Sequence, residues 1–351
     1  MATLYVTEQG AQVEKEYQKL VVTKEDETLV AVQAQQVTEV VLVGNIGVTT
    51  PAVAFLLERA VPVVYLNSRG RLRGRLVGAA ARNLDLRHQQ YRRSEDATFC
   101  LSISRTIVRG KLENYRALAL RMARAAESRA AKPATGDPST PVKTGSSART
   151  AVGDIDSQLD AIARAPDLGT LRGIEGAGSK AYFGALRAAF QHDLGFAKRA
   201  RRPPPDPINA LLSFGYTMLG ENLFAALEIV GLDPYDGFYH ADRYGRPALA
   251  LDLMEEFRGV IVDSLALNLI NREIIGAEDF EKAEDAEHGV FLKHHALRKF
   301  LHHYSARLNT MVRHPYFLKS WTYQKCFEAQ ARLMRQVIEG KASVYLPFRT
   351  K

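Results

Sequence analysis

The chain has 351 residues, of which 46% are hydrophobic, so it is long enough to form two domains with separate cores. Lys and Arg outnumber Asp and Glu by 47 to 39, and the net charge of +8 favours a polyanionic partner such as nucleic acid, although a membrane surface would also fit. No apolar run approaches the roughly 18 residues of a membrane-spanning helix, and the N-terminus lacks a signal sequence. We therefore expect a cytoplasmic protein that does not bind membranes. Cys100 and Cys326 lie too far apart in sequence for a disulfide framework or a zinc ribbon.

The first part of the chain has the pattern of a small β domain. β-branched runs separated by turn residues predict strands at 4–7, 20–23, 28–32, 39–43 and 62–66. Between them, residues 50–59 predict a helix with Thr50 as its N-cap and Pro51 in the first position. We assign this domain to residues 1–75.

From residue 76 onward the pattern changes to helical periodicity, which predicts a second, α-helical domain over residues 76–351. The predicted fold class is therefore α+β, with a small N-terminal β-rich domain followed by a larger all-α domain. Residues 125–153 contain a run of small, polar and proline residues that cannot bury enough apolar surface to order itself, so we predict a disordered insertion there.

An imidazole and several carboxylates fall close together in residues 236–258. His240 lies in a turn-rich segment, where a side chain can be aimed into a site. In the helix predicted to follow, Asp252 shares a face with Glu255 or Glu256, and like charges at this spacing repel one another. A bound cation would compensate the repulsion, whereas the alternative is an exposed, solvated face.

Glu175 is a further acidic candidate, because the glycines beside it permit close approach of another element. The alternative interpretation is an acid in the first turn of a helix, where the helix dipole favours it without any ligand. The neighbouring glycines could also form a phosphate-binding loop, but their spacing matches neither known glycine-rich motif.

One nitrogen ligand and two or three oxygen ligands suit Mn²⁺ or Mg²⁺ better than zinc. Such a metal can polarise a phosphodiester and activate a water or a 3′-hydroxyl as nucleophile. The basic composition explains why a phosphodiester would approach the site.

Basic residues cluster around the domain junction and recur in a predicted helix over residues 291–304, which indicates a surface that follows a phosphate backbone without reading the base sequence. The alternative is a set of solvated helix faces. The residues predicted to contact DNA are Arg69, Arg71, Arg73, Arg75, Arg82, Arg298 and Lys299.

Three motifs together resemble the Cas1 family, the CRISPR-associated integrases that acquire new spacers. They are the Glu175 segment at 173–183, the segment at 209–216, and the segment from Gly231 through His240 to Arg258, in the order in which the family carries them. The β-rich beginning and α-rich remainder extend the resemblance over nearly the whole chain. Gly259 departs from it, because the family often has Pro at that position, and residues 135–147 look like an insertion.

The resemblance implies that Glu175, His240 and Glu255 are the catalytic residues and the ligands of Mn²⁺ or Mg²⁺, with Asp252 and Asp263 as accessory carboxylates. It also implies a homodimer that assembles with the small Cas2 protein on double-stranded DNA. The expected reaction is a transesterification, in which a 3′-hydroxyl of captured DNA attacks a phosphodiester of the CRISPR repeat.

Two other functions remain open at this stage. The same metal site could serve a nuclease that cleaves branched DNA in repair. A scaffold that binds nucleic acid without catalysis would explain the basic surface, but it leaves the three ordered motifs unexplained.

Overall fold

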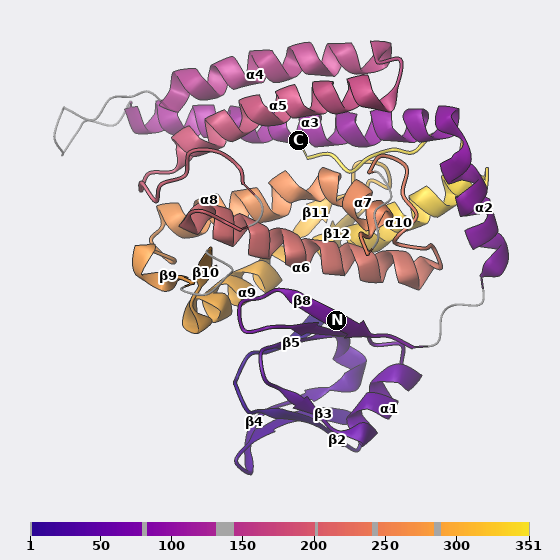
Figure 1. The fold of residues 1–351 in the computed structure, drawn as a ribbon, viewed down its shortest axis with the longest axis vertical. Helices are drawn as coiled ribbons and strands as arrows, with labels where there is room; N and C mark the ends of the chain where they lie inside the picture. The colour runs from indigo at the N-terminus through magenta and orange to yellow at the C-terminus, as the bar shows by residue number, and fades with distance from the viewer. Residues whose placement is uncertain are drawn as a thin grey trace.

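Two four-stranded sheets form the N-terminal domain in the computed structural model, which describes residues 2–78, 83–130, 144–200, 203–240, 245–283 and 289–350 (Figure 1). The first sheet has the order β1 (Ala2–Val6), β5 (Val37–Val43), β7 (Val63–Leu66) and β8 (Leu72–Leu76). Its first three strands are parallel, and β8 is antiparallel to β7. The second sheet has the order β4 (Glu27–Gln33), β3 (Lys19–Lys24), β2 (Gln12–Glu16) and β6 (Gly47–Val48).

Apolar side chains from both sheets form the core of this domain. Val13, Leu20, Val40 and Val63 are fully buried in it, and helix α1 (Thr50–Glu58) adds Phe55. A short 3₁₀ turn, η1 (Ala34–Gln36), leads into β5. The β-branched runs of the central strands therefore supply much of the core.

The sequence did not reveal β2, β6 and β8. In β2 only one residue, Val13, is buried, and β8 carries arginines beside Gly74, so neither strand shows a clear apolar alternation. The N-cap of α1 is Thr49, whose side chain accepts from the amide of Ala52, rather than Thr50.

Helices dominate the rest of the described chain and confirm the predicted fold class. Helices α3, α4 and α5 form an outer layer, and α6, α7, α8 and α10 lie between it and the β domain (Figure 1). Two short antiparallel strand pairs are added to the helices, β9 with β10 and β11 with β12. In chain order the elements are α2 (Leu84–Glu95), α3 (Ala97–Ala130), α4 (Thr144–Ala161), η2 (Ile162–Arg164), α5 (Leu168–Ala189), α6 (Pro207–Val230), α7 (Ala248–Arg258), η3 (Gly259–Asp263), α8 (Ser264–Asn271), η4 (Ala277–Asp279), β9 (Phe280–Lys282), β10 (Val290–Leu292), α9 (His294–Leu308), β11 (Met311–Arg313), β12 (Ser320–Thr322) and α10 (Tyr323–Ile338).

The prediction of a disordered insertion over residues 125–153 is wrong at both ends of that range. Helix α3 continues to Ala130 and α4 begins at Thr144, while residues 131–143 lie outside the described part of the chain. Alanine-rich sequence favours helix, and Ala148 and Ala151 of α4 are buried against α3 and α5. The composition of the segment did not reveal that one face of α4 packs against α3 and α5.

Buried polar contacts join the β domain to the helical domain. Arg75 on β8 donates two hydrogen bonds to Glu221 on α6, at 2.5 and 2.7 Å, and its guanidinium stacks on Phe224. Nearby, Asn222 donates to Glu39 of β5 and accepts from the hydroxyl of Tyr304, completing a fully buried network. Within the described residues no helix is long and apolar enough to cross a membrane.

Candidate active site

Helix α7 is acidic and yet almost entirely buried. Every residue from Asp252 to Arg258 is shielded from solvent, because α7 packs between α3 and α6. The apolar residues Leu253 and Phe257 supply its core contacts. The alternative of an exposed, solvated face is therefore excluded, and each buried carboxylate requires a partner.

Asp252 finds its partners in the segment that ends at His240. One carboxylate oxygen accepts from the amides of Phe238 and Tyr239, and the other accepts from the amide and the Nδ1 of His240, at 2.9 and 2.7 Å. Gly237 makes this possible, since a Cβ there would lie 2.7 Å from the carbonyl carbon of Ala248. Asp252 thus fixes the orientation of the imidazole, as carboxylates commonly do for metal-binding histidines.

Glu175 lies well inside helix α5, which begins after its N-cap Asp167. Both the helix N-terminus and the phosphate-binding loop are thus wrong interpretations of this segment, because its glycines are helical. One of them, Gly178, allows close approach to α3, since a Cβ there would come within 2.6 Å of Leu112. This contact brings Glu175 up to α3.

Lys111 of α3 lies between the two glutamates. Its ammonium is ion-paired with Glu175 and lies 2.6 Å from Glu255 Oε2, and its side chain is only 3% exposed. On the other side of Glu255, the Nε2 of His240 is 3.6 Å from Oε1. The structure therefore brings together all three residues that the resemblance to the Cas1 family implied. Lys111 lies between the two glutamates, and His240 lies beside Glu255.

Positive charges control the ionisation of these carboxyl groups. Burial alone would raise the pKa of Glu255, but the charges of Arg258, Lys111 and His240 outweigh it and lower the pKa to about 2. The same competition between burial and the charge of Lys111 lowers the pKa of Glu175. Arg258 Nη2 also lies 2.8 Å from Glu255 Oε1, so Glu255 is held as a carboxylate from two sides.

Glu256 points away from this cluster. It accepts from the hydroxyl of Tyr345, the amide of Phe348 and the side chain of Gln330. Burial raises its pKa to about 8, because no cation compensates the lost hydration. Helical spacing left the choice between Glu255 and Glu256 open, and their contacts differ: Glu255 faces Lys111 and His240, whereas Glu256 anchors the C-terminal residues.

Asp263 belongs to a different set of contacts. It ends η3, a π-helical turn, and accepts a 2.5 Å hydrogen bond from Tyr216. Burial raises its pKa to about 6, although the Tyr216 hydroxyl and the charge of Arg258 act in the opposite direction. Asp263 therefore faces the positive charge of Arg258, the residue that holds Glu255. Gly259 begins the turn, where a Cβ would come within 2.9 Å of Tyr115 and Leu118.

The donor set of this cluster suits a hard divalent cation. The described residues contain no group of three or more His, Cys, Asp and Glu side chains that could hold a metal ion as it stands, since Lys111 separates the two glutamates. Their carboxylates already bind one cationic group, however, and the Asp252 bond to Nδ1 leaves Nε2 of His240 available as a ligand. Glu175 and Glu255 thus offer carboxylate oxygens and His240 a ring nitrogen, which are donor types that Mn²⁺ and Mg²⁺ accept.

The sequence did not identify Lys111 as part of the site. Its position gives a signal in retrospect, because Val108, Lys111 and Tyr115 follow one another on the buried stripe of α3. A lysine in such a stripe requires a buried anion. Arg258, also missed, is buried as well, and its partner Glu255 lies one helical turn earlier.

The predicted DNA-contacting residues do not form one uniform surface. Arg73 on β8 and Arg71 just before it are exposed, and Arg69 stacks on Phe291. Arg75, in contrast, is bound to Glu221 inside the domain interface and does not lie at a surface open to DNA. Arg82 lies outside the described residues.

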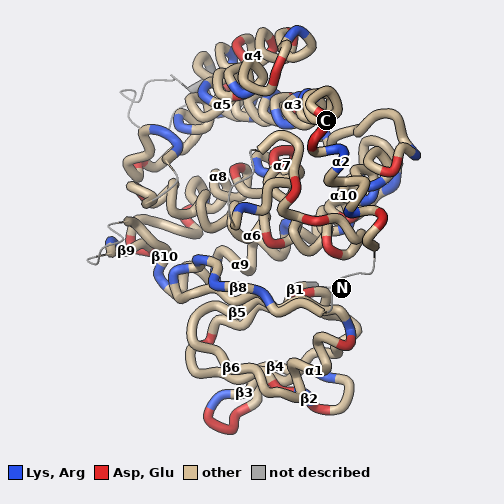
Figure 2. Tube along the Cα trace, turned by 45° about the vertical axis from the view of Figure 1, so that its right-hand side comes forward, with Lys and Arg blue, Asp and Glu red and all other residues tan. Residues whose placement is uncertain are grey.

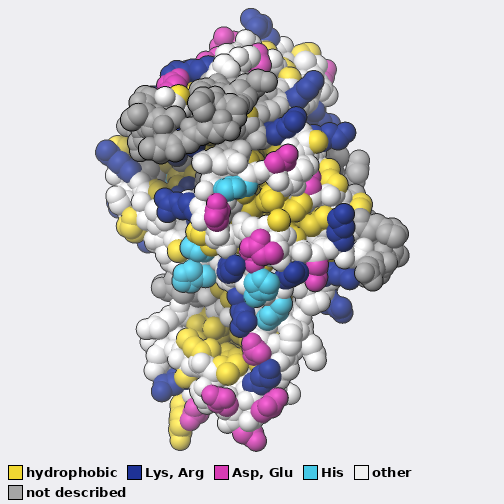
Figure 3. All heavy atoms as spheres, turned by 90° about the vertical axis from the view of Figure 1, so that its left-hand side faces the viewer, with side chains coloured by type: hydrophobic (Ala, Val, Ile, Leu, Met, Phe, Trp, Pro, Cys, Tyr) yellow, Lys and Arg dark blue, Asp and Glu magenta, His cyan; other side chains and the backbone are white. Residues whose placement is uncertain are grey.

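On α9, Lys299 is paired with Asp279 and Arg298 with Glu8. Figure 2 shows basic residues of β8 and α9 near the domain junction, and Figure 3 shows histidines, basic groups and carboxylates intermingled on one face. The predicted basic surface is therefore partly neutralised.

A β-rich N-terminal region followed by a larger helical domain is also the architecture of solved Cas1 structures, such as that of a Cas1 protein from Thermotoga maritima, which superposes with a TM-score of 0.78 over 98% of this chain and 99% of that one, at 20% identity. A family model described as CRISPR associated protein Cas1 matches residues 4–306, and the chain belongs to this family.

Two relatives cover nearly the whole chain. The CRISPR-associated endonuclease Cas1 1 of Moorella thermoacetica is 35% identical over 99% of this chain and 97% of its own length. A CRISPR-associated exonuclease Cas4/endonuclease Cas1 fusion of Geobacter sulfurreducens is 37% identical, and this chain spans 60% of that longer protein.

Solved structures share the fold. A casposase bound to integration product superposes with a TM-score of 0.81 at 23% identity, covering 99% of this chain and 93% of that one. A chain of a Cas6-RT-Cas1–Cas2 complex gives a TM-score of 0.79 at 25% identity, covering 98% of this chain and 36% of that one.

Proposed function

We propose that this protein is a metal-dependent DNA integrase and endonuclease of CRISPR adaptation. In the proposed reaction, a 3′-hydroxyl of a captured DNA fragment attacks a phosphorus atom of the repeat. A new phosphodiester forms while the original ester bond breaks, and the displaced strand end leaves with a 3′-hydroxyl. Because one ester replaces another, the reaction needs no covalent enzyme intermediate.

The observation that carries the proposal is the convergence of three separate segments on one point. Glu175 comes from α5, His240 from the segment before α7, and Glu255 from α7 itself, and Lys111 bridges the two carboxylates. Burying two carboxylates beside each other is unfavourable unless cations compensate them. An arrangement maintained at such a cost indicates a functional site.

Each residue around the cluster has a distinct task. Asp252 accepts a hydrogen bond from Nδ1–H of His240, which leaves the lone pair on Nε2. Arg258 keeps Glu255 ionised and limits its rotation. Glu175, Glu255 and His240 would hold Mn²⁺ or Mg²⁺, which when bound supplies charge stabilisation at the phosphate and activation of the nucleophile.

Double-stranded DNA and Cas2 are the proposed partners, with a homodimer as the proposed functional unit. The similarity to a casposase that is bound to its integration product supports DNA as the substrate. The similarity to a chain of a Cas1–Cas2 complex supports the protein partner. The formal net charge of +8 favours the same polyanionic substrate.

The test is a joining assay with the purified protein, Cas2, a labelled short duplex and a plasmid that carries the repeat. We expect joined product in Mn²⁺ or Mg²⁺, and its loss in the variants Glu255→Gln and His240→Ala. Glu256→Gln is the matched control, since it makes the same chemical change one residue further along α7, on a side chain that faces the C-terminal residues.

Joining that persists in His240→Ala would show that the assigned site is wrong. Metal-dependent hydrolysis of branched DNA, with no joined product even when Cas2 is present, would identify a repair nuclease instead. Salt-sensitive DNA binding without metal binding in calorimetry would identify a scaffold.

A further inference from the structure

Helix α3 carries buried polar and charged side chains on the face that meets α7. They are Ser104, Lys111 and Asn114, which are 0%, 3% and 1% exposed. Spacings of seven and three residues place them on one face of the helix. A polar side chain that is removed from water needs a partner, so each of these residues must bind a group on a neighbouring element.

The candidate site is divided between two layers of helices (Figure 1). Glu175 on α5 and Lys111 on α3 belong to the outer layer. Glu255 lies on α7 and His240 in the segment before it, so both belong to an inner layer formed by α6, α7, α8 and α10. Lys111 crosses the boundary, because it pairs with Glu175 and lies 2.6 Å from Glu255. The spacing of the two layers therefore decides whether the two halves of the site meet.

Asn114 binds the main chain of α7 beside Glu255. Its side-chain nitrogen donates to the carbonyl oxygen of Glu256 at 2.8 Å. This bond lies three residues along α3 from Lys111 and one residue along α7 from Glu255, so it joins the two helices next to their ion pair. Because the acceptor is a main-chain carbonyl, the bond does not depend on the Glu256 side chain.

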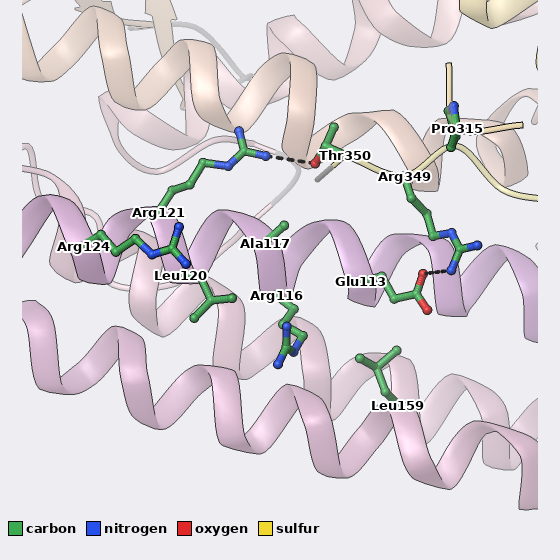
Figure 4. A pocket seen from close by; sticks show the side chains of 10 residues that line it. All are labelled: Glu113, Arg116, Ala117, Leu120, Arg121, Arg124, Leu159, Pro315, Arg349 and Thr350. Carbon is green, nitrogen blue, oxygen red and sulfur yellow. Dashed lines mark hydrogen bonds and ion pairs between the residues drawn. The ribbon is translucent and has the colours of Figure 1, made fainter. Parts of the chain in front are cut away.

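The C-terminal residues fix the orientation of the Asn114 amide. Its nitrogen also donates to the carbonyl of Phe348 at 2.9 Å, and its oxygen accepts from the amide of Thr350 at 2.8 Å. Between these two residues, Arg349 lies 2.8 Å from Glu113 of α3, in the pocket shown in Figure 4. With two hydrogen bonds donated and one accepted, the buried amide can hold only one orientation.

Ser104 makes a corresponding contact near His240. Its hydroxyl donates to the carbonyl of Phe238 at 3.2 Å, two residues before His240. From α5, Arg172 donates to the carbonyl of Tyr239 at 2.8 Å. The outer layer therefore binds the main chain of the inner layer beside both of its site residues.

Two glycines allow α3 to come this close. Gly110 directly precedes Lys111, and a Cβ there would collide with Pro347 of the C-terminal residues. Gly259 directly follows α7, and a Cβ there would come within 2.9 Å of Leu118, one helical turn beyond Asn114. Close packing on both sides of Asn114 leaves its hydrogen bond little freedom to shift.

We propose that Asn114 and Ser104 are positioning residues, which hold the inner half of the site in register with the outer half. They act through main-chain carbonyls and touch neither the reacting atoms nor the ligand atoms of Glu255 and His240. The idea rests on the proposed function, because the reaction requires both halves of the site. It adds that the spacing of those halves is set by side chains of α3 that carry no charge.

A double-mutant cycle on stability tests the proposal without metal or DNA. Equilibrium denaturation gives the unfolding equilibrium constants of the wild type, Asn114→Ala, Lys111→Met and the double variant. While Asn114 is present, Lys111 is held close to Glu255, and its substitution removes a tight ion pair. Without Asn114 the pair is looser, so the factor by which Lys111→Met raises the unfolding equilibrium constant should be about tenfold smaller.

Asn222→Ala is the matched control. Asn222 is also a buried asparagine, but it bonds to Glu39 and Tyr304 next to the β domain. In that background Lys111→Met should keep its full effect. Additive effects of Asn114→Ala and Lys111→Met would overturn the proposal, and so would an equal coupling in the control, which would indicate a general loss of packing.

Ser104→Ala provides a milder variant, since it removes a single hydroxyl. It should reduce the effect of Lys111→Met by about two- to threefold, near the lower end of couplings between neighbouring residues. This variant keeps the proposal testable even when Asn114→Ala does not fold. Additivity of Ser104→Ala with Lys111→Met would overturn the assignment of Ser104.

Binding of Mn²⁺, measured by calorimetry without DNA, relates the positioning to the proposed site. Asn114→Ala should weaken binding by about tenfold, as the loss of an outer partner of a metal-binding residue does, whereas Asn222→Ala should keep the wild-type dissociation constant. An unchanged dissociation constant in Asn114→Ala would contradict the proposal. A wild type that binds no Mn²⁺ would reject the proposed metal site, while the stability cycle still decides whether Asn114 positions Lys111. Coupling together with absent joining would support the positioning role and reject the proposed reaction.

Discussion

Lys111 provides the sharpest test of how the site is built, through the substitution Lys111→Met. Methionine keeps most of the volume of the side chain but removes the charge that bridges Glu175 and Glu255. Lys111 and Glu255 are each 3% exposed, so water cannot replace the lost ammonium. Removing one partner of such a buried pair costs about 3–5 kcal/mol, and the value should lie near the lower end because Arg258 still contacts Glu255.

A divalent cation should then compensate the loss. In the variant, Mn²⁺ can bind the two carboxylates without displacing an ammonium, so at about one hundred times its dissociation constant it should restore about 2.7 kcal/mol. In the wild type the same concentration should stabilise less, because binding must first break the contacts of Lys111. Equilibrium denaturation of both proteins, with and without Mn²⁺, measures the four free energies of unfolding that are needed.

Two outcomes would refute this reasoning. The first is a variant as stable as the wild type without metal, which would mean that the carboxylates do not depend on Lys111. The second is an equal stabilisation of both proteins by Mn²⁺, which would mean that metal and lysine do not compete. The double variant Lys111→Met/Glu175→Gln is the control, since it removes one of the repelling charges and should recover part of the lost stability.

Three further substitutions test other parts of the argument. Glu256→Gln should keep joining activity and remove a pH dependence of stability. With its pKa raised from 4.5 to about 8, the wild-type carboxyl contributes its full stabilisation below pH 4.5, and this contribution falls by about 1.4 kcal/mol per pH unit up to pH 8, as denaturation at several pH values can show. Arg75→Ala should lower the free energy of unfolding by about 3–5 kcal/mol by leaving Glu221 buried alone, and no recovery in Arg75→Ala/Glu221→Gln would contradict this. Asp252→Asn should weaken Mn²⁺ binding by about 10–100-fold, and an unchanged dissociation constant in calorimetry would show that Asp252 does not orient His240.

Local signals in the sequence were enough to predict the fold class, whereas Glu175, His240 and Glu255 were indicated together only by the resemblance of three ordered motifs to the Cas1 family, because helical spacing alone left Glu255 and Glu256 open. The sequence could not reveal which distant residue is the partner of each buried carboxylate. Lys111 and Glu175 are 64 residues apart, Arg75 and Glu221 are 146 apart, and Glu256 bonds to Phe348 across 92 residues. Such pairings arise from the packing of whole elements, which periodicity within one element does not describe.

Burial explains the remaining differences between the predictions from sequence and the structure. An exposed, solvated face is the alternative interpretation of the α7 carboxylates from sequence, yet they are buried, because Lys111 of α3, backbone amides of the segment before α7 and Arg258 of α7 itself replace water. Similarly, Arg75 of β8, which was predicted to contact DNA, is needed to compensate the buried charge of Glu221. A charge in a sequence therefore predicts that a partner exists, but not whether that partner is solvent, ligand or protein.

The anchoring of the C-terminal residues has a practical consequence for engineering. Tyr345 and Phe348 donate hydrogen bonds to Glu256, which directly follows Glu255 in the chain. Truncating the protein before Tyr345 would therefore leave the buried Glu256 carboxyl without these hydrogen bonds, next to the reaction centre. Such a shortened protein could lose activity and be mistaken for one with a damaged active site. Affinity tags and fluorescent fusions should therefore be attached beyond Thr350 through a flexible linker, with the preceding residues left intact, and any survey of deletions should score folding before chemistry.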